Sequence, residues 1–575
     1  MHTNLAGTIQ IPQINRRIDW RGLGWAYLFF WYFSGIHHLL LQLSGNTTFV
    51  GFRLAAIASL LWLIPLLIFP QRTRHITAAI GVILWAFSLI SLGYFWIYGQ
   101  EFSQSVIFII FESNTAEASE YVAQYFNWWM LPATVAYSAG AYFLWRKLRP
   151  IHMTRWQAWL IIALIVCAIF GYPQLKQLRG LQFSSPVAAE RIQKNMEPAV
   201  PWQIFVGYAQ YRKQLEAMQD LLKKNNQIPP LANLSDANAG LPATLVLVLG
   251  ESTNRQHMSL YGYSRQTTPQ LDAMRNELFI FNQVVASRPY TIETLQQVLT
   301  FADQEQPDLY LTQPSLMNMM KQAGYKTFWV TNHQTMTERN TMLTNFSQQT
   351  DEQVYLNNSR EQNARSYDGN LIEPFRKMLA DPAERKFIIV HMLGTHMKYE
   401  YRYPSEFDRF NDRQGLANWV TEEQMPVINH YDNAVLYHDQ VVANLIKSLS
   451  AVGGNAMMAY FADHGEDVFD SPGHTILGRN EGKPTAPMYT VPFFIWESAD
   501  WRKRHPRNYA KLADRPYQTS HFIHTWADLA GIRFDGFDAS KSLVNQAFRE
   551  RPLWVGDPIN PKGLADLRTS MSAKR

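Results

Sequence analysis

The stretch at residues 245–255 reads LVLVLGESTNR, in which five apolar residues run directly into a polar cluster. Short apolar runs that end at turn-forming residues are typical of strands buried on both faces. Four more such runs follow along the chain, and two helical patterns lie among them. The runs are Thr327–Thr331, Phe387–Leu393, Met457–Phe461 and Val491–Trp496, and the helical patterns are Met317–Ala323 and Val435–Leu449. Strands that alternate with helices predict an α/β domain with a mainly parallel sheet.

Three of the predicted strands end in polar clusters, and ligands gather at the carboxyl ends of parallel strands. The clusters contain Glu251 after Leu245–Leu249, His391 and His396 in and after Phe387–Leu393, Asp463 and His464 after Met457–Phe461, and His474 ten residues beyond His464. Carboxylates and imidazoles are common metal ligands, so we expect a metal site at this edge. For each residue taken alone, the alternative is a structural role, in which it caps a backbone end or forms a hydrogen bond in the core. This alternative is weakest for the adjacent pair Asp463-His464.

A hydroxyl nucleophile is expected within residues 287–295, which read SRPYTIETL and lead into a helical pattern. Thr291 would lie near the helix N-terminus, where free N–H groups and the helix dipole favour an anion. Coordination to a metal would lower the pKa of its hydroxyl and make it a usable nucleophile. An N-cap threonine without a catalytic role fits the spacing equally well.

The first 172 residues carry almost all of the long apolar runs of a chain that is 47% hydrophobic and 17% charged overall. Spanning a bilayer requires about 20 mostly apolar residues. Five segments meet or approach this length: Leu23–Leu43, Phe49–Phe69, Ile76–Tyr98, Trp128–Trp145 and Trp156–Tyr172. We therefore expect a five-span membrane bundle at the N-terminus.

The loops between these segments indicate an orientation. Arginine and lysine gather before the first span, between the second and third, and between the fourth and fifth. The loop at residues 99–127 has neither and contains four glutamates. By the positive-inside rule the N-terminus is cytoplasmic, and everything after Tyr172 lies outside the cytoplasm. No small-residue cleavage site follows the first span, which we expect to act as an uncleaved anchor.

Three regions are expected: a membrane bundle at residues 1–172, a connector at 173–240 and an exported catalytic domain at 241–575. In the connector, Trp202–Lys224 suits either an amphipathic helix on the membrane surface or an ordinary packed helix. The one cysteine, Cys167, falls in the fifth span. The exported domain therefore has no disulfides, and a metal site in it must use His, Asp, Glu or Thr.

These motifs resemble those of the lipid phosphoethanolamine transferases of the alkaline-phosphatase/sulfatase superfamily. The matching stretches are Gly250–Arg255, Met258–Tyr263, Thr267–Pro269, Ser287–Thr291, His391–His396, Tyr431–Asn433 and Ala462–Glu466. The resemblance covers nearly the whole chain, including the five-span anchor and the segment Glu112–Glu120. It implies a multi-pass protein of the bacterial inner membrane whose periplasmic domain transfers phosphoethanolamine from phosphatidylethanolamine to lipopolysaccharide.

The resemblance also implies a tetrahedral zinc site. Its ligands would be Glu251, Thr291, Asp463 and His464. Thr291 would be the nucleophile that becomes modified with phosphoethanolamine before the acceptor receives the group. One zinc ion is expected, and a second ion stays open.

Further residues match family positions around this site. His396 and His474 match histidines near the substrate phosphate or a second zinc. One of these two or His391 is expected to protonate a leaving oxygen. In the membrane region, Glu117 and Ser113 are similar to positions that shape the donor-lipid pocket.

Two departures from the family pattern bear on the acceptor and on the nucleophile. Members that act on lipid A usually carry periplasmic disulfides and a Cys-Gly-Thr run before the nucleophile, and this chain has neither. Residues 287–293 and 311–317 instead resemble the branch that modifies a heptose of the lipopolysaccharide core. Thr294 and Ser287 stay open as alternative nucleophiles.

Other functions remain as alternatives. A sulfatase needs Cys or Ser, then Pro two residues on, then Arg two beyond; Ser287 and Pro289 fit, but Thr291 stands where the arginine would be. Phosphoglycerol transfer and lipid A modification would use the same fold and metal chemistry. A non-catalytic membrane scaffold that binds envelope glycans is the alternative from another class. We expect lipids, lipopolysaccharide and the membrane as partners, and no nucleic acid.

Overall fold

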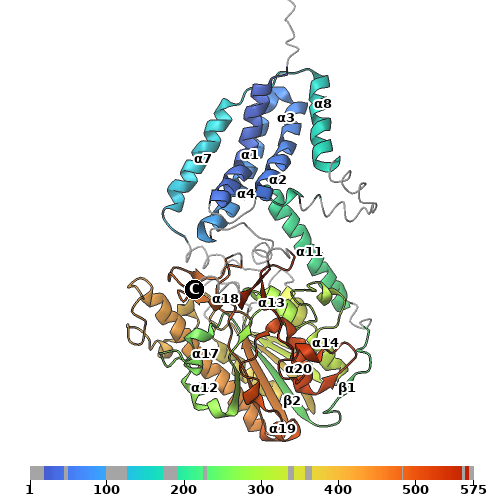
Figure 1. Cartoon of the computed structure of the whole chain (residues 1–575), viewed down its shortest axis with the longest axis vertical. Helices are drawn as coiled ribbons and strands as arrows, with labels where there is room; N and C mark the ends of the chain where they lie inside the picture. Colours follow the sequence, from blue (N-terminus) through green and yellow to red (C-terminus); the bar gives the residue numbers. More distant parts are fainter. Residues whose placement is uncertain are drawn as a thin grey trace, which may run out of the picture. The chain divides into compact units, whose positions relative to one another are not determined.

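The computed structural model describes residues 18–43, 49–98, 126–171, 192, 195–223, 229–333, 342–356, 366–481, 483–559 and 564–568. These residues form two compact units, and the chain passes from the first to the second between Tyr211 and Arg212. Figure 1 colours both units along the chain, with the first in blue and cyan shades.

The described part of the N-terminal unit is helical. Its helices are α1 (Trp20–Leu43), α2 (Phe49–Ser59), α3 (Ile64–Ile68), α4 (Thr73–Tyr98), α7 (Met130–Lys147) and α8 (Arg155–Val166). A 3₁₀ turn at Leu60–Leu63 separates α2 from α3, and a π turn at Cys167–Gly171 follows α8. Pro65 lies in the first turn of α3. Because proline has no N–H to donate, the regular helix that begins at Phe49 is interrupted just before it.

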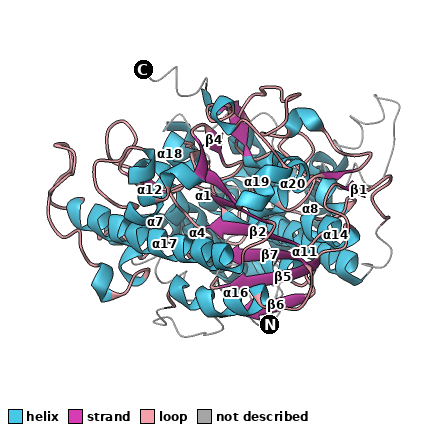
Figure 2. Ribbon diagram, turned by 90° about the horizontal axis from the view of Figure 1, so that it is seen from below, coloured by secondary structure: helices cyan, strands magenta, loops and turns pink. Residues whose placement is uncertain are grey.

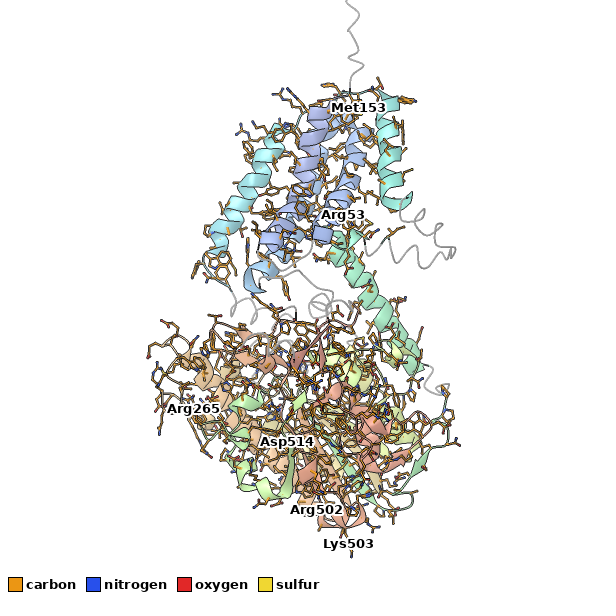
Figure 3. The ribbon with its side chains drawn as sticks, viewed as in Figure 1. Arg53, Met153, Arg265, Arg502, Lys503 and Asp514 are labelled. Carbon is orange, nitrogen blue, oxygen red and sulfur yellow. The ribbon has the colours of Figure 1, made fainter. Side chains whose placement is uncertain are left out.

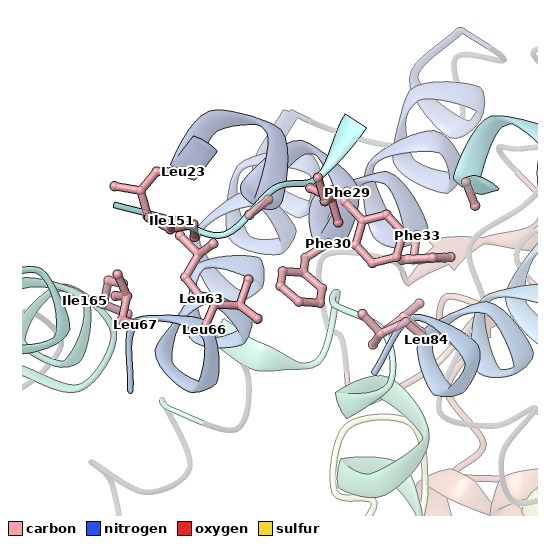
Figure 4. Close-up of a cluster of buried hydrophobic side chains, with 14 of the residues drawn as sticks. Leu23, Phe29, Phe30, Phe33, Leu63, Leu66, Leu67, Leu84, Ile151 and Ile165 are labelled. Atoms are coloured by element: carbon pink, nitrogen blue, oxygen red, sulfur yellow. The ribbon is translucent and has the colours of Figure 1, made fainter. Parts of the chain in front are cut away.

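Apolar side chains of this unit face both inward and outward. Inside, Phe29, Phe30 and Phe33 of α1 pack in a buried cluster with Leu66 of α3 and Leu84 of α4 (Figure 4). Large apolar side chains of the unit also remain exposed, among them Val82 and Ile90 of α4, Val135 and Phe143 of α7, and Leu164 of α8. An apolar surface around an apolar core fits a bundle that contacts lipid.

The five predicted spans coincide with α1, with α2 and α3 together, and with α4, α7 and α8. Within the described residues, two helical stretches, Gly51–Ile68 and Pro70–Ile97, are long and apolar enough to cross a membrane. Five crossings therefore stay a prediction. Trp202–Lys223 forms the helix α11, which includes the boundary between the units. The position of α11 on a membrane surface also remains a prediction. So does the division of the chain into a membrane bundle, a connector and a catalytic domain.

The C-terminal unit is built on a seven-stranded sheet in the order β3-β11-β8-β2-β7-β5-β6. The strands are β2 (Ala243–Gly250), β3 (Leu278–Phe281), β5 (Lys326–Thr331), β6 (Glu352–Tyr355), β7 (Arg385–His391), β8 (Ala456–Ala462) and β11 (Phe493–Glu497). β11 is antiparallel to both of its neighbours, whereas the other adjacent pairs are parallel. The sheet is thus mixed, with one reversed strand. Figure 2 shows β2, β7, β5 and β6 side by side.

Helices cover both faces of this sheet. α12 (Pro269–Ala273) and α17 (Met425–Val452) lie on one side, and α14 (Leu316–Gln322) and α20 (Phe522–Ala530) lie on the other (Figures 1 and 2). The other helices are α13 (Thr291–Val298), α15 (Met342–Ser347), α16 (Ile372–Leu379), α18 (Ala486–Tyr489) and α19 (Ala499–Arg504). α13 lies at one end of the sheet, and α19, with Arg502 and Lys503, lies at the opposite end (Figures 1 and 3).

Four pairs of two-residue strands lie outside the main sheet. They are β1 (Ser235–Asp236) with β13 (Ile532–Arg533), β4 (Val284–Val285) with β12 (Tyr517–Gln518), β9 (Asp467–Val468) with β10 (Leu477–Gly478), and β14 (Trp554–Val555) with β15 (Ala565–Asp566). The β9–β10 pair is a small hairpin directly after the end of β8, and it positions residues of the site described below.

The predicted α/β domain is confirmed, and all five predicted strands are present. Leu245–Leu249 of β2 are fully buried, as a strand covered on both faces requires. β7 ends at His391 rather than at the predicted Leu393. The chain leaves the sheet there because the N–H groups of Leu393 and Gly394 donate to the Asp368 carboxylate, at 2.9 and 2.7 Å.

Candidate active site

The sheet brings Glu251, Asp463 and His464 together at one edge. Glu251 follows β2 and Asp463 follows β8, and the residues before them, Gly250 and Ala462, are partners in the parallel ladder. All three side chains are fully buried. They offer ligand atoms that lie within 4.8 Å of one another. The carboxyl ends of two neighbouring parallel strands therefore bring two carboxylates and one imidazole into one compact group.

Thr291 joins this group from α13, of which it is the first residue, while Tyr290 occupies the N-cap position. The Thr291 hydroxyl donates to Glu251 Oε2 at 2.8 Å and lies 3.4 Å from His464 Nε2. Because Tyr290 is the N-cap, the alternative of a threonine that only caps the helix is wrong. Thr291 is half-buried, whereas Glu251, Asp463 and His464 are fully buried.

The two carboxylates respond to burial in opposite ways. Burial by itself raises the pKa of Glu251, but its interaction with His464 outweighs burial and holds that pKa well below its usual value. Burial and the negative charge of Glu251 raise the pKa of Asp463 well above its usual value. Two buried carboxylates this close can both ionise only when a cation compensates them.

The hydrogen bonds of the group fit a metal ion. Asp463 Oδ1 accepts from the N–H groups of Ser252 and His464, at 3.2 and 2.7 Å, whereas Oδ2 has no hydrogen-bond partner among the described residues. His464 Nδ1 lies 2.9 Å from the Gly465 carbonyl oxygen and so carries the proton, which leaves the Nε2 lone pair directed into the group. This is the arrangement of metal-binding histidines, whose other nitrogen donates to an acceptor. The residues present therefore fit a metal.

The backbone around Glu251 is held by close contacts. Ser252 has φ 54°, a left-handed conformation that non-glycine residues rarely adopt. Gly394 has φ 56°, and a Cβ there would lie 2.6 Å from the Glu251 carbonyl oxygen. The Thr395 N–H donates to that same oxygen at 3.1 Å. Glycine at position 394 thus allows the loop after β7 to pack directly against the loop after β2.

Three histidine rings lie beside Glu251. The rings of His333 and His391 stack at 5.1 Å, and the rings of His333 and His396 are 6.0 Å apart. His333 Nε2 is 3.9 Å from Glu251 Oε2. Burial lowers the pKa of His391 to about 3 and that of His396 well below its usual value, so both rings are neutral at physiological pH.

The structure places His474 differently from the other candidates. Its Nδ1 lies 2.8 Å from the Phe469 carbonyl oxygen, and its ring stacks on Trp419 at 3.7 Å. None of these contacts between described residues reaches Glu251 or Thr291. Its role near the phosphate or a second zinc stays a prediction. The donor-lipid candidates Glu117 and Ser113 lie outside the described residues.

The two alternative nucleophiles, Thr294 and Ser287, are both buried. The Thr294 hydroxyl is fully buried and donates to the Arg288 carbonyl oxygen at 2.8 Å. Ser287 is also fully buried. Among these three hydroxyls, the hydrogen bond to Glu251 belongs to Thr291.

Sequence reasoning missed two residues of the site. His333 follows β5, so the strand-end rule that found Glu251 could have found it as well. Arg479 lies after β10, with its Nη1 at 2.6 Å from His464 Nε2 and its Nε at 3.1 Å from Glu466 Oε2. A hairpin of two-residue strands has no periodic pattern, so the sequence gives no signal for this position.

Comparison with known proteins gives the family of the chain. Residues 243–532 match the Sulfatase family model. The phosphoethanolamine transferase EptC of Escherichia coli strain RS218 is 50% identical over 557 residues, which cover 96% of each chain. The chain belongs to the phosphoethanolamine transferase family. CptA of Salmonella typhimurium, another phosphoethanolamine transferase, is 49% identical over 561 residues and 97% of each chain.

Solved structures of phosphoethanolamine transferases agree in fold. The C-terminal periplasmic domain of EptC from Escherichia coli, crystallised in complex with zinc, has 55% identity and a TM-score of 0.58 over 60% of this chain and 97% of its own. The integral membrane lipooligosaccharide phosphoethanolamine transferase A of Neisseria meningitidis covers 93% of this chain, with a TM-score of 0.61 and 18% identity. The second match extends the shared fold to the helical N-terminal unit.

Proposed function

We propose that this transferase moves phosphoethanolamine from phosphatidylethanolamine to lipopolysaccharide, at a heptose of the core, through a covalent intermediate on Thr291. The observation that carries the proposal is the convergence of Thr291 with Glu251, Asp463 and His464. A glycan-binding scaffold would not require these groups to converge. The chain lacks the Cys-Gly-Thr run and the disulfides that members acting on lipid A usually carry, which supports a heptose of the core as acceptor rather than lipid A.

We propose zinc as the metal, held by Glu251, Asp463, His464 and the Thr291 oxygen. Oxygen and nitrogen donors without thiolate are a common zinc set, and the related Escherichia coli domain crystallised with this ion. When bound, zinc lowers the pKa of the threonine hydroxyl and offsets negative charge in the transition state. One ion satisfies these donors, and the neutral His391 and His396 are the residues available to a second.

The residues of the chain carry the two transfer steps. In the first, Thr291 Oγ1 forms a bond to phosphorus, and the bond from phosphorus to the diacylglycerol oxygen breaks. Glu251 orients Oγ1 through the 2.8 Å hydrogen bond. In the second step, a hydroxyl of the acceptor sugar attacks the same phosphorus and the bond to Thr291 breaks. The enzyme returns to its starting state after one group has been transferred.

Proton transfer falls to the neutral histidines beside Glu251. A neutral imidazole can take the proton that the attacking hydroxyl releases and return it to the leaving oxygen. His396 is nearly buried, and its Nδ1 has no hydrogen-bond partner among the described residues. The same is true of Nε2 of His391. One of these two nitrogens is therefore the proposed proton carrier.

We propose further that the N-terminal unit crosses the bacterial inner membrane five times and leaves the catalytic domain in the periplasm. The exposed apolar side chains of its helices and the uneven distribution of basic residues among its loops support this topology. A reporter active only outside the cytoplasm should be active when fused after residue 575 and silent within residues 146–155. The reverse pattern would refute the topology.

The acceptor is tested by mass analysis of lipopolysaccharide from cells with and without the protein. The expected result is one phosphoethanolamine mass on a core heptose that depends on the protein and on Thr291. The added mass of a phosphoglycerol group, or the modification of lipid A, would overturn the proposed transfer.

A further inference from the structure

Arg479 lies in the site, but the zinc chemistry proposed above gives it no role. The β9–β10 hairpin pairs Gly478 with Asp467, which places Arg479 opposite Glu466. Arg479 Nε lies 3.1 Å from Glu466 Oε2, and the Tyr399 hydroxyl donates to Glu466 Oε1 at 3.0 Å. Glu466 thus accepts a hydrogen bond on one oxygen and forms an ion pair with Arg479 through the other, which keeps the guanidinium beside the site.

The far end of the guanidinium points at His464 and Glu251. Arg479 Nη1 lies 2.6 Å from His464 Nε2 and 3.7 Å from Glu251 Oε1. Thr291 Oγ1 lies 3.4 Å from the same His464 nitrogen. The side chain of Arg479 is only 11% exposed, so its charge acts in a largely water-free setting. A cation is therefore held within reach of the atom that would attack phosphorus.

The contact between Arg479 and His464 cannot coexist with a metal bond at the same nitrogen. His464 Nδ1 is engaged with the Gly465 carbonyl, so Nε2 is the nitrogen with the lone pair. A ring nitrogen has one lone pair, and a guanidinium has N–H donors but no acceptor. When His464 binds a metal, Arg479 Nη1 loses this acceptor, and a phosphoryl oxygen next to Thr291 is suited to replace it.

From this geometry, and resting on the function proposed above, we propose that Arg479 is a catalytic residue that binds a non-bridging oxygen of the phosphoryl group during transfer. Negative charge grows on the phosphoryl oxygens as the bond to Thr291 forms and the bond to the leaving oxygen breaks. A fixed guanidinium stabilises that charge, and Glu466 and Tyr399 are positioning residues that keep it aimed at the reacting phosphorus.

The test uses the full-length, zinc-loaded protein in detergent, with inorganic phosphate as the probe. Zinc content is measured by elemental mass spectrometry, and phosphate binding is measured by calorimetry. Arg479→Met should keep its zinc and weaken phosphate binding by about tenfold or more. It should also slow formation of the modified threonine by about 100-fold. Arg479→Lys, which keeps the charge but loses the planar fork, should recover part of both.

Two controls make the outcome decisive. Arg502→Met removes an exposed arginine from α19, at the opposite end of the sheet, and should change neither binding nor rate. Thr291→Ala should still bind phosphate in a manner that depends on Arg479, so a wrong nucleophile would not mask the result. Unchanged phosphate binding in Arg479→Met, or loss of its zinc, would overturn the proposal.

Discussion

Two groups of buried charges lie at either end of the short segment Glu251–His257, and they are built in opposite ways. At one end, Glu251 meets Asp463 and His464 in the catalytic group. At the other, His257 meets Asp432 of α17, with His257 Nδ1 at 2.7 Å from Asp432 Oδ1. Both groups are inaccessible to solvent apart from small residual areas. Burial therefore does not distinguish them, but the number of hydrogen-bond partners does.

The group around Asp432, which we call the structural network, consists of His257, Tyr263, Arg265, Asp432 and Asp470. Arg265 Nη1 and the Tyr263 hydroxyl both donate to Asp432 Oδ2, at 2.9 and 3.0 Å. His257 Nε2 lies 3.2 Å from Asp470 Oδ1. Each charge of the network thus has an opposite charge inside the protein. In the catalytic group, by contrast, Asp463 Oδ2 has no hydrogen-bond partner among the described residues.

The difference shows how to separate a binding site from a structural ion network. A buried network that pairs its own charges stabilises a loop and has no capacity for a ligand. A buried group in which two carboxylates converge and one carboxylate oxygen has no hydrogen-bond partner requires a cation from outside. The structural network also supports the site, because its neighbour Tyr431 donates to the Ser252 carbonyl and accepts from the Asn254 N–H, each at 2.8 Å.

The largest effect is expected from Thr291→Ala. The hydroxyl is lost while the three buried ligands remain, so the protein should fold, keep weakened zinc binding and lose transfer by about 10³-fold or more. Thr294→Ala is the matched control, since Thr294 donates to the Arg288 carbonyl and should cost far less activity. Activity of purified variants on phosphatidylethanolamine measures both. An active Thr291→Ala protein would remove Thr291 from the mechanism.

The next largest effect, removal of the metal, tests the difference between the catalytic group and the structural network. A chelator should abolish transfer and lower the melting temperature of the wild type, and added zinc should restore both. Asp463→Asn should already lack zinc and therefore show no further change in melting temperature with the chelator. If the chelator destabilised Asp463→Asn as much as the wild type, Asp463 would not be a ligand.

Asp432→Asn should act on the fold rather than on the chemistry. It leaves the buried Arg265 without its carboxylate and His257 with Asp470 alone, which we expect to cost about 3–5 kcal/mol of stability. Denaturant unfolding of the variant measures this loss. The protein that remains folded should bind zinc with the wild-type stoichiometry. A loss of zinc without a loss of stability would reverse the roles of the two groups.

The last effect is a pH dependence of stability carried by His257. Burial opposes its charge, but Asp470 and Asp432 outweigh burial and raise its pKa from 6.5 to about 10. A raised pKa in the folded state gives stability that is complete below pH 6.5 and is lost as pH rises to about 10. Unfolding measured across this range should show the decline, and His257→Gln should show a flatter curve. Equal slopes in the two proteins would contradict the charged state of His257.

Much of this architecture could be predicted from the sequence, and there are physical reasons why the rest could not. Leu245–Leu249 and Met457–Phe461 are central strands covered on both faces, so their apolar runs are unambiguous. Their parallel register then places Glu251 beside Asp463, which makes the core of the site predictable. The direction of β11 was not predictable, since a buried run looks the same in either orientation.

Residues that depend on loops were harder to assign. Arg479 reaches the site through a hairpin of two-residue strands, and His474, which has φ 51°, stacks its ring on Trp419. Neither arrangement leaves a periodic pattern in the sequence. Thr291 lies between these cases, because the helix start was predictable whereas its hydrogen bond to Glu251 was not.

Peptide mass spectrometry of the wild-type enzyme after incubation with phosphatidylethanolamine tests the central claim most directly. If the catalytic group is a site for zinc-dependent transfer, the mass of one phosphoethanolamine should appear on the peptide that contains Thr291. The modification should be absent after chelation and should disappear when the acceptor lipopolysaccharide is added. Modification of Ser287 or Thr294, or transfer without any modified peptide, would contradict the covalent mechanism on Thr291.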